Sequence, residues 1–348
     1  MTQQRSVLLI GTFLSAFGGR RGVSEDLAEE LRRRGWKVIT ASARPGRPGR
    51  ILDMLATTWR YRGQYACASV EVYSGPAFIW AEAVCSLLRI LGRPYVLVLH
   101  GGNLPAFARQ WPRRVRRLLN SAAVVTCPSQ FLATALAGFG REIRVIPNGV
   151  DLGRFRFRLR RTLERRLVWL RAFHRLYDPE LAVRVAAIVA RSFPGLRLTL
   201  CGVDKHDGTL ERVERLIAEL GVDGTVIVRG PVPRAGVPEV LDGSDILLNT
   251  ARVDNTPVSV IEAMASGLCI VSTSAGGLSY LIEDGREGLL VRVGDAQAMA
   301  DAVLRLLRSA ELASKLSANA RHRAMCFDWS HIVPEIEAVL DGLGTAQG

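Results

Sequence analysis

The sequence predicts an α/β protein of two domains, each built on a parallel sheet that is covered by helices. Three observations lead to this prediction. A chain of 348 residues is long for one hydrophobic core. Its composition, 48% hydrophobic and 23% charged, is that of an ordinary globular protein. Apolar runs of strand length alternate with amphipathic helical segments, which is typical of parallel sheets with helices on both faces.

The expected strands divide equally between the two halves of the chain. In the first half they are "SVLLIG", "KVITAS", "ACASVEVY", "YVLVLH", "AAVVTC" and "IRVIPN". In the second half they are "RLVWL", "LRLTLCG", "TVIVRG", "DILLNT", "CIVSTS" and "GLLVRV". Helices are expected between them, for example over "VSEDLAEELRRRG" and "DPELAVRVAAIVARSF", where apolar residues recur at helical spacing.

The first apolar run, within residues 5–17, has two interpretations. One arginine before a short apolar core is also the pattern of a signal peptide, although the run is too short to span a bilayer. We interpret it as the first strand, followed by a glycine loop and a helix. Cleavage would remove that strand from its βα unit.

An arginine-rich piece with little strand character, residues 151–166, is expected to be the linker between the domains. We therefore expect an N-terminal domain over 1–155 and a C-terminal domain over 162–325. The remaining residues, 326–348, are expected to form a helix that packs back toward the N-terminal domain. Two such domains leave a cleft between the carboxyl ends of their strands, where ligands bind.

The six cysteines are widely spaced, and none forms a CxxC pair. Most lie in apolar runs, so we expect buried, reduced thiols and no zinc site or disulfide framework. A reducing, cytoplasmic location follows from this interpretation.

Charge is distributed unevenly between the two halves. Residues 1–160 hold 25 basic and 9 acidic residues, a balance of +16, whereas the rest of the chain has a balance of −3. The asymmetry indicates that the first domain meets an anionic partner. Residues 108–119, "ARQWPRRVRRLL", form a basic amphipathic pattern. It is typical of a helix lying in an anionic membrane interface, and equally of a surface helix with its apolar side inward.

The most informative stretch is "TARVDNTPVSVIEAMASG", residues 250–267. It predicts a loop that leads from a strand into a helix, with Pro257 near the first turn. The free N–H groups at such a helix start, together with the helix dipole, suit phosphate. Glu262, about one turn into the helix, can accept two hydroxyls of a ribose, and Asp254 can reach a further hydroxylated ring. Together these groups describe a nucleotide-sugar site. The alternative is that Glu262 is an ordinary acid near a helix start.

The segment "DNTPVSVIEAMASGLCIVSTSAGGLSYLIEDGREGLLV" strongly resembles glycosyltransferase family 4, a family of retaining enzymes with the GT-B fold. The family signature is a Glu, seven residues, a second Glu, then Ala-Met-Ala-x-Gly and a later Gly-Gly. This chain has Asp254 at the first acidic position and Glu262 at the second. Three further matches occur in the family's order: "LHGGN", "VIPNGVDLGRF" and "WLRAF". The resemblance implies two Rossmann-like domains facing each other across a cleft, and a nucleotide-sugar donor.

The resemblance also implies roles for individual residues. His100 would lie beside the donor sugar, Arg171 would face the diphosphate, and Asp254 would position the sugar; these three are the expected catalytic residues. Donor binding is expected to involve the following residues: Gly18, Gly19, Arg171, Gly202, Lys205, Asn255, Thr256, Pro257, Val258 and Glu262.

Two positions depart from the family pattern. Asp254 stands where the family usually has Glu, and Leu176 stands where it usually has a Lys. Arg175 and Lys205 are candidates to supply the missing charge. Because Arg171 and the helix dipole can neutralise the leaving diphosphate, and no DxD motif occurs, no metal or other cofactor is expected.

The implied reaction is transfer of a sugar with retention to a glycan or lipid-linked acceptor, by an enzyme with a possible peripheral position at an anionic membrane. Two other classes stay open. A non-catalytic GT-B protein that binds sugar nucleotides fits the two departures. A nucleic-acid-binding protein fits the basic half, although "RFRFRLRR" is the only tract in which aromatic and basic residues alternate, so no nucleic acid is expected as a partner.

Overall fold

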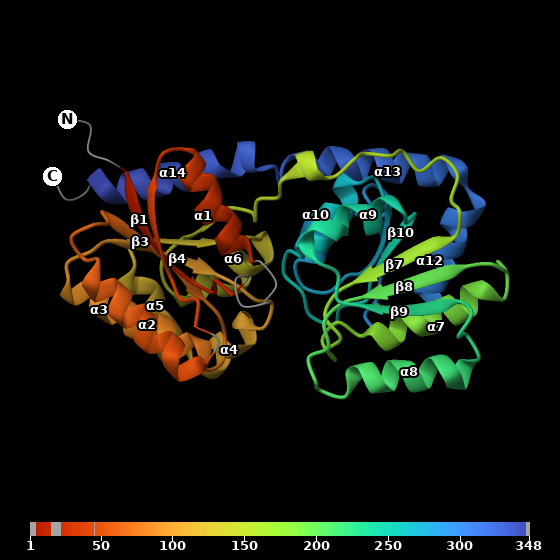
Figure 1. Cartoon of the computed structure of the whole chain (residues 1–348), viewed down its shortest axis with the longest axis horizontal. Coiled ribbons are helices and arrows are strands. Elements are labelled where there is room, and N and C mark those ends of the chain that lie inside the picture. The colour runs from red at the N-terminus through yellow and green to blue at the C-terminus, as the bar shows by residue number, and fades with distance from the viewer. Residues whose placement is uncertain (1–4, 15–21, 45, 346–348) are drawn as a thin grey trace. The chain divides into compact units, whose positions relative to one another are not determined.

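The computed structural model describes residues 5–14, 22–44 and 46–345. The chain forms two compact units (Figure 1). Unit 1 comprises residues 1–149 and 329–348, and unit 2 comprises residues 150–328. Unit 1 is therefore discontinuous in sequence, and the chain passes between the units at residues 149–150 and 328–329.

Unit 1 is built on a six-stranded parallel sheet with the order β2-β1-β3-β4-β5-β6. All six strands lie within the runs expected from the sequence. Their bounds are β1 (Ser6–Ile10), β2 (Lys37–Ala41), β3 (Cys67–Val72), β4 (Tyr95–Leu99), β5 (Val124–Cys127) and β6 (Ile143–Val145).

Helices cover both faces of this sheet. Alternate residues of β1 point to opposite faces, so Leu8 and Ile10 pack in one core cluster and Val7 and Leu9 in another. The helices are α1 (Val23–Arg33), α2 (Arg47–Arg60), α3 (Ala77–Ile90), α4 (Leu104–Gln110), α5 (Pro112–Ser121), α6 (Gln130–Leu136) and α14 (Trp329–Thr345), with the 3₁₀ turn η2 (Ala137–Phe139).

The C-terminal helix α14 completes the core of unit 1, where it lies alongside α1 (Figure 1). Its residue Glu337 accepts a 2.8 Å hydrogen bond from the indole N–H of Trp36, in the turn between α1 and β2. At its start, Trp329 packs flat on Gly149, where a Cβ would lie 2.2 Å from the indole ring. A side chain at residue 149 would therefore displace the helix.

Unit 2 repeats the design with a six-stranded parallel sheet in the order β12-β11-β10-β7-β8-β9. The strands again match the sequence expectation. They are β7 (Arg166–Leu170), β8 (Arg197–Cys201), β9 (Val226–Gly230), β10 (Ile246–Asn249), β11 (Cys269–Thr273) and β12 (Leu289–Val291).

The helices of unit 2 also pack on two faces. One core cluster includes Trp169 and Leu200 under α7, α8 and α12, and the other includes Val168 and Leu247 under α9, α10 and α13. The bounds are α7 (Pro179–Ala190), α8 (Thr209–Leu220), α9 (Val237–Asp242), α10 (Val258–Ala265), α11 (Leu278–Leu281), α12 (Ala296–Arg308) and α13 (Ala310–Met325), with the 3₁₀ turns η3 (Leu152–Arg154) and η4 (Arg234–Gly236).

The expected linker is instead an integral part of unit 2. Residues 150–155, which we expected in the first domain, begin this unit: the N–H of Val150 bonds the Phe327 carbonyl at 2.8 Å, and Phe155 is buried in its core. Residues 326–328, which we expected in the C-terminal helix, also lie in unit 2. The boundaries therefore follow burial rather than the change in sequence composition.

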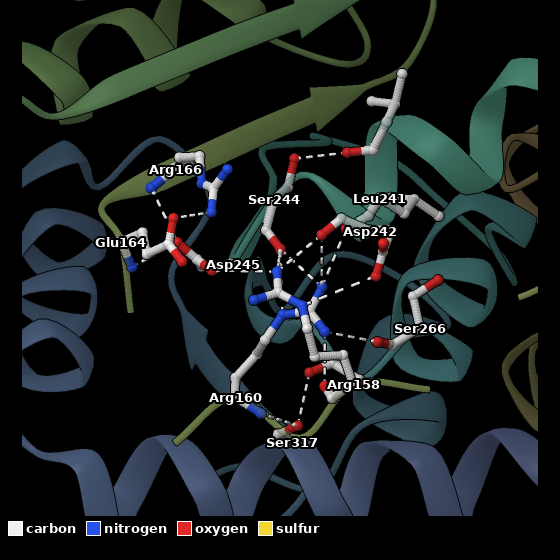
Figure 2. Close-up of polar contacts among 12 residues, drawn as sticks. Arg158, Arg160, Glu164, Arg166, Leu241, Asp242, Ser244, Asp245, Ser266 and Ser317 are labelled. Carbon is white, nitrogen blue, oxygen red and sulfur yellow. Dashed lines mark hydrogen bonds and ion pairs between the residues drawn. The ribbon is translucent and has the colours of Figure 1, made fainter. Parts of the chain in front are cut away.

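Arg160 shows most clearly that this segment is packed. Its guanidinium is fully buried and donates to the backbone carbonyls of Leu241, Ser244 and Ser266, at 3.1, 2.7 and 2.9 Å (Figure 2). Arg158 also donates to the Ser244 carbonyl, at 3.2 Å. Two of these carbonyls lie just before β10 and the third lies just after α10, on the side of the sheet away from the carboxyl ends of the strands. Arg160 therefore holds together the two ends of the β10–α10 segment, which carries the candidate site. With Arg154, which donates to the Arg234 carbonyl at 2.8 Å, three arginines of the "RFRFRLRR" tract bind backbone carbonyls.

The basic stretch 108–119 does not form one amphipathic helix. It is divided at Trp111, because Pro112 is the first residue of α5 and cannot continue the hydrogen bonding of α4. Val115, Leu118 and Leu119 are buried in unit 1, so their apolar side faces inward and is unavailable to a membrane. The exposed side of α5 carries arginines. No helix in the described residues is long and apolar enough to cross a membrane.

Five of the six cysteines are buried, and Cys326 is exposed; all are free thiols. Burial raises the pKa of Cys67 to about 12 and that of Cys201 to about 11. Both thiols therefore stay protonated at neutral pH and serve as small core side chains.

Candidate functional site

In each unit the strand order reverses at one place, and ligands of open α/β sheets bind at the carboxyl ends of strands there. In unit 1 the reversal lies between β1 and β3, and in unit 2 between β7 and β10. The candidate residues gather at these two places, which we call switch point 1 and switch point 2.

At switch point 2, Arg171 directly follows β7 and Asp254 lies in the loop after β10. The guanidinium and carboxylate form an ion pair at 2.8 Å, with only 15% and 10% of the two side chains exposed. The Arg171 guanidinium also stacks over the Tyr177 ring at 4.1 Å. Its buried Nε has no hydrogen-bond partner among the described residues, so one donor remains for a bound anion.

The backbone of Arg171 is held by the neighbouring strand. Its N–H bonds the Cys201 carbonyl at 3.1 Å, which extends the β7–β8 ladder by one residue. A Cβ on Gly202 would lie 1.6 Å from the Arg171 carbonyl oxygen. Glycine is required at residue 202 because the ends of β7 and β8 approach so closely. Close packing therefore explains why this expected donor-binding residue is a glycine.

The loop after β10 is closed by its own hydrogen bonds. The Asn255 N–H donates to Asp254 Oδ1 at 2.9 Å, and the Gly277 N–H donates to the Asp254 carbonyl at 3.1 Å. A Cβ on Gly277 would lie 2.0 Å from the Asn255 carbonyl oxygen. The Gly-Gly pair of the motif thus lets the loop after β11 support the acidic loop.

Helix α10 begins at Val258, directly after this loop, with Pro257 in the N-cap position and no side-chain cap. Thr256 completes the connection from Asp254 to the helix. The first-turn N–H groups therefore point to the same edge as Arg171 and Asp254, as an anion site requires. Glu262 lies in the second turn with 5% of its surface exposed. The second acidic residue of the motif therefore lies on the same strand-to-helix connection as Asp254.

The two residues proposed to replace the missing family Lys lie on the loops after β7 and β8. Arg175 and Lys205 are both exposed. Their backbones are fixed, since the Arg175 N–H bonds Asp207 at 3.1 Å and the Lys205 N–H bonds the Phe173 carbonyl at 3.1 Å. The hydrogen bond from Thr209 is the main reason that the pKa of Asp207 falls to about 2.

Another arginine lies beside Leu176 and was missed in the sequence. The Arg252 N–H donates to the Leu176 carbonyl at 2.8 Å. The Arg252 guanidinium binds the buried carboxylate of Asp178 through Nε and Nη2, both at 2.8 Å. The chain therefore brings a cation to the segment where the family has its Lys, although one carboxylate already balances it.

At switch point 1, His100 follows β4, and its N–H bonds the Val72 carbonyl at 2.8 Å. Its Nε2 lies 3.4 Å from the Glu71 carboxylate, and its ring stacks on Tyr73 at 5.1 Å. Ser24, in α1, donates a hydrogen bond to the same carboxylate. Burial lowers the pKa of His100, and the charge of Glu71 opposes this shift.

An apolar cavity of about 70 Å³ adjoins this group, between the sheet of unit 1 and helices α1 and α14. Leu9, Val98 and Ile336 contribute to its aliphatic lining. Glu71 and His100 are the ionisable side chains among the described residues that line it. The pair is therefore buried and also adjoins open space.

The expected residues are thus distributed over both switch points. Arg171 and Asp254 are in contact, and the 255–258 segment and Glu262 lie on the same strand-to-helix connection. His100 belongs to unit 1. Gly18 and Gly19 lie outside the described residues. Sequence reasoning missed Glu71, whose only signal was a charged residue inside an apolar strand.

Comparisons with known proteins agree with this arrangement of motifs. The family described as Glycosyltransferase Family 4 matches residues 17–154, and the family described as Glycosyl transferases group 1 matches residues 156–323. The chain is glycosyltransferase family 4-like in both of its halves. The two matches meet at residues 154–156, close to the boundary between the units.

Among curated relatives, this family 4-like chain is similar to two proteins named D-inositol 3-phosphate glycosyltransferase. One, from Acidothermus cellulolyticus, is 30% identical over 66% of this chain and 56% of its own length. The other, from Nocardia farcinica, is 31% identical over 56% of this chain and 47% of its own length. The chain spans about half the length of these relatives.

Solved structures show the fold of this family 4-like chain to be that of the GT-B glycosyltransferases. Sucrose-phosphate synthase from Thermosynechococcus elongatus matches with a TM-score of 0.81 at 18% identity, over 99% of this chain and 100% of that one. HepE from Anabaena, in complex with UDP and glucose, matches with a TM-score of 0.78 at 20% identity, over 97% and 100%.

Proposed function

We propose that the protein is a retaining glycosyltransferase that moves a sugar from a nucleoside-diphosphate sugar to a hydroxyl of a glycan or lipid-linked acceptor. The observation that carries this proposal is the buried Arg171–Asp254 pair at switch point 2, next to the start of α10. A cation, a carboxylate and a helix N-terminus at one strand edge are the groups that a diphosphate bound to two hydroxylated rings requires.

Arg171 and the first turn of α10 would hold the diphosphate. As the bond to the sugar breaks, negative charge grows on the leaving phosphate, and a guanidinium already in position stabilises it without reorganisation. The orphan Nε of Arg171 is available for this contact. Because these groups supply the positive charge, we expect no metal requirement.

The two carboxylates would bind the rings. Glu262 would accept hydrogen bonds from the hydroxyls of the ribose. Asp254 would position the transferred sugar and stabilise positive charge that develops on it. Neither role needs a covalent intermediate, since the acceptor can attack from the face that the diphosphate leaves. The leaving phosphate can take the acceptor's proton.

Support for a uridine nucleotide donor comes from HepE, which binds UDP and glucose and has the same fold. We therefore propose to begin a thermal-stability screen with UDP and UDP-glucose, and to extend it to other bases and sugars. A ligand at 100 times its dissociation constant adds about 2.7 kcal/mol to stability. The anomeric configuration of the product, measured by NMR, then tests retention.

Failure of every nucleotide and sugar nucleotide to shift the melting temperature would contradict the proposal. A second candidate, sugar-nucleotide binding without transfer, is favoured by one observation: Leu176 is 39% exposed where the family has a Lys. Binding without donor turnover at high protein concentration would support that candidate.

A further inference from the structure

Glu71 is a buried charged residue that the proposed donor chemistry does not use. It lies in β3, where its neighbours in the strand are apolar and buried, yet its side chain is only 11% exposed. Burying a carboxylate costs several kcal/mol unless it is paired or hydrogen-bonded. The surroundings of Glu71 therefore need an explanation.

Three groups from three segments converge on this carboxylate. Ser24 in α1 donates to Oε1, the Tyr73 hydroxyl donates to Oε2 at 3.3 Å, and His100 Nε2 lies 3.4 Å from Oε1. His100 Nε2 makes no hydrogen bond among the described residues, so its 3.4 Å approach to Glu71 Oε1 is a close contact that falls short of one. Such long contacts are common in ligand-free sites and shorten when the site is occupied.

The backbone also leaves room for the carboxylate. A Cβ on Gly11, which directly follows β1, would lie 2.4 Å from Glu71 Oε2. The backbone of Gly11 does not have a positive φ, so glycine is needed here because it has no side chain and not because of its backbone conformation. The strands β1 and β3 are neighbours at switch point 1, and Gly11 thus lets the Glu71 side chain occupy the place where a ligand site is expected.

We propose that Glu71 is a positioning residue for His100: its carboxylate receives the Nε2 proton of the imidazole, which leaves the Nδ1 lone pair as the acceptor in the site. In this arrangement Glu71 selects one tautomer and fixes the plane of the ring, and the Tyr73 ring supports the plane by stacking. The inference rests on the proposed function only for the use that the site makes of His100.

The electrostatic surroundings are simple. Among the described residues, the titratable groups that face the imidazole are Glu71 and Tyr73. Burial raises the pKa of Tyr73 well above its usual value, so the phenol stays neutral. Burial lowers the pKa of His100 and Glu71 raises it, so removal of the carboxylate charge must lower it further.

The test is NMR of the imidazole nitrogens and carbons in the full chain, with the His100 signals assigned by comparison with His100→Gln. The wild type should show the Nε2–H tautomer at neutral pH. In Glu71→Gln, which keeps the shape of the side chain, the pKa of His100 should fall by about one unit or more, as expected for loss of an opposite charge at this distance. Glu335→Gln is the control, since it removes a carboxylate of the same unit that is 45% exposed and bound to Arg144.

A second variant tests geometry without removing the charge. Gly11→Ala should displace the carboxylate from His100, reducing the share of the Nε2–H tautomer while lowering the pKa less than Glu71→Gln. If the tautomer and the pKa of His100 are the same in wild type, Glu71→Gln and Gly11→Ala, the proposal is wrong.

Turnover separates this proposal from the proposed function. Glu71→Gln should reduce transfer while leaving the affinity for UDP unchanged, because the nucleotide groups lie at switch point 2. A protein that binds neither UDP nor UDP-glucose, yet shows the expected NMR changes, would refute the donor assignment and support the Glu71–His100 pair. Equal loss of UDP affinity and turnover would instead make Glu71 a general structural residue and overturn its positioning role.

Discussion

The two switch points occupy the same topological place in two similar sheets, but they carry different chemistry. Switch point 2 joins a guanidinium to a carboxylate, and its strand edge ends at a helix N-terminus. Switch point 1 joins a carboxylate to an imidazole and adjoins an apolar cavity. Switch point 2 suits a permanently charged ligand, whereas switch point 1 suits a group that exchanges protons. The sheet provides the position, and the side chains at the carboxyl ends of the strands and in the loops that follow decide the chemistry.

The largest effect is expected when Arg171 is replaced by Ala. Transfer should fall roughly a hundred- to a thousandfold, as when a single preorganised donor is removed, while affinity for the donor falls less. Donor consumption under single-turnover conditions measures the rate, and calorimetry measures the affinity. Arg184→Ala, which removes an exposed arginine of α7, is the control. Equal losses in rate and affinity would make Arg171 an anchor of the ground state.

Replacing Arg160 tests how strongly its hydrogen bonds stabilise the segment that carries switch point 2. Arg160→Met leaves buried carbonyls without donors, at about 1 kcal/mol or more each. The free energy of unfolding of unit 2 should fall by about 3 kcal/mol, which corresponds to a fall in Tm of roughly 6–12 °C. Calorimetry would show this, with Arg161→Met, on the exposed side of the same segment, as the control. An unchanged Tm would show that water or rearrangement satisfies those carbonyls.

The excess positive charge of unit 1 gives the next prediction. Arg113, Arg116 and Arg117 are exposed on α5, whereas Arg114 pairs with Glu82 at 2.5 Å. If the first three dock on anionic lipid, changing them to Gln should weaken liposome binding roughly a hundredfold at low salt, at about 1 kcal/mol per charge. The control changes three exposed arginines of unit 2 instead: Arg184, Arg215 and Arg292.

Co-sedimentation with anionic liposomes measures this binding. It should fade between 0.1 and 1 M salt, where the Debye length falls from about 10 to about 3 Å. Wild-type protein that stays in the supernatant at low salt would exclude the docking surface, and a soluble acceptor would then be the better assignment.

Glu262→Ala should weaken donor binding about ten- to a hundredfold, because a charged hydrogen bond contributes on the order of 1.5–3 kcal/mol. Titration calorimetry with UDP measures the change. Glu283→Ala, which removes an exposed carboxylate of the same unit, should leave the affinity unchanged. Unaltered affinity in the Glu262 variant would remove this residue from the site.

The smallest effect is expected from chelation. If Arg171 and the start of α10 neutralise the diphosphate, excess EDTA should leave the transfer rate unchanged. The assay is donor consumption before and after treatment, with added Mg²⁺ as the comparison. Loss of activity that Mg²⁺ restores would show that a metal ion helps to neutralise the charge of the diphosphate.

Local patterns in the sequence predicted the strands well. "DILLNT" and "CIVSTS" each contain three consecutive apolar residues in a stretch of strand length, and both strands proved to be buried on both faces of a sheet. The acidic loop and helix after β10 were also predictable, because all their parts are adjacent in the chain. Local order in the sequence was enough for this edge of switch point 2.

Features that depend on distant partners were not predictable. The 151–166 segment looked like a linker because its arginines are typical of solvent, but the acceptors of Arg160 are carbonyls more than 80 residues away. Likewise, Glu71 meets Ser24 and His100 only after β1, β3 and β4 are aligned. Arg252 approaches Leu176 from another strand end. In each case the pairing is set by the sheet.

The placement of α14 in unit 1 has a consequence for synthesis of the chain on the ribosome. Unit 2 lies wholly between the two parts of unit 1, so all of its strands emerge before residues 329–345 do. Until then the face of β1 and β3 that carries Val7 and Cys67 is covered by α1 without α14, so the nascent first half exposes apolar side chains that α14 later buries. Unit 2 can therefore complete its folding first, and a stop codon before Trp329 would leave unit 1 without α14 and prone to aggregation.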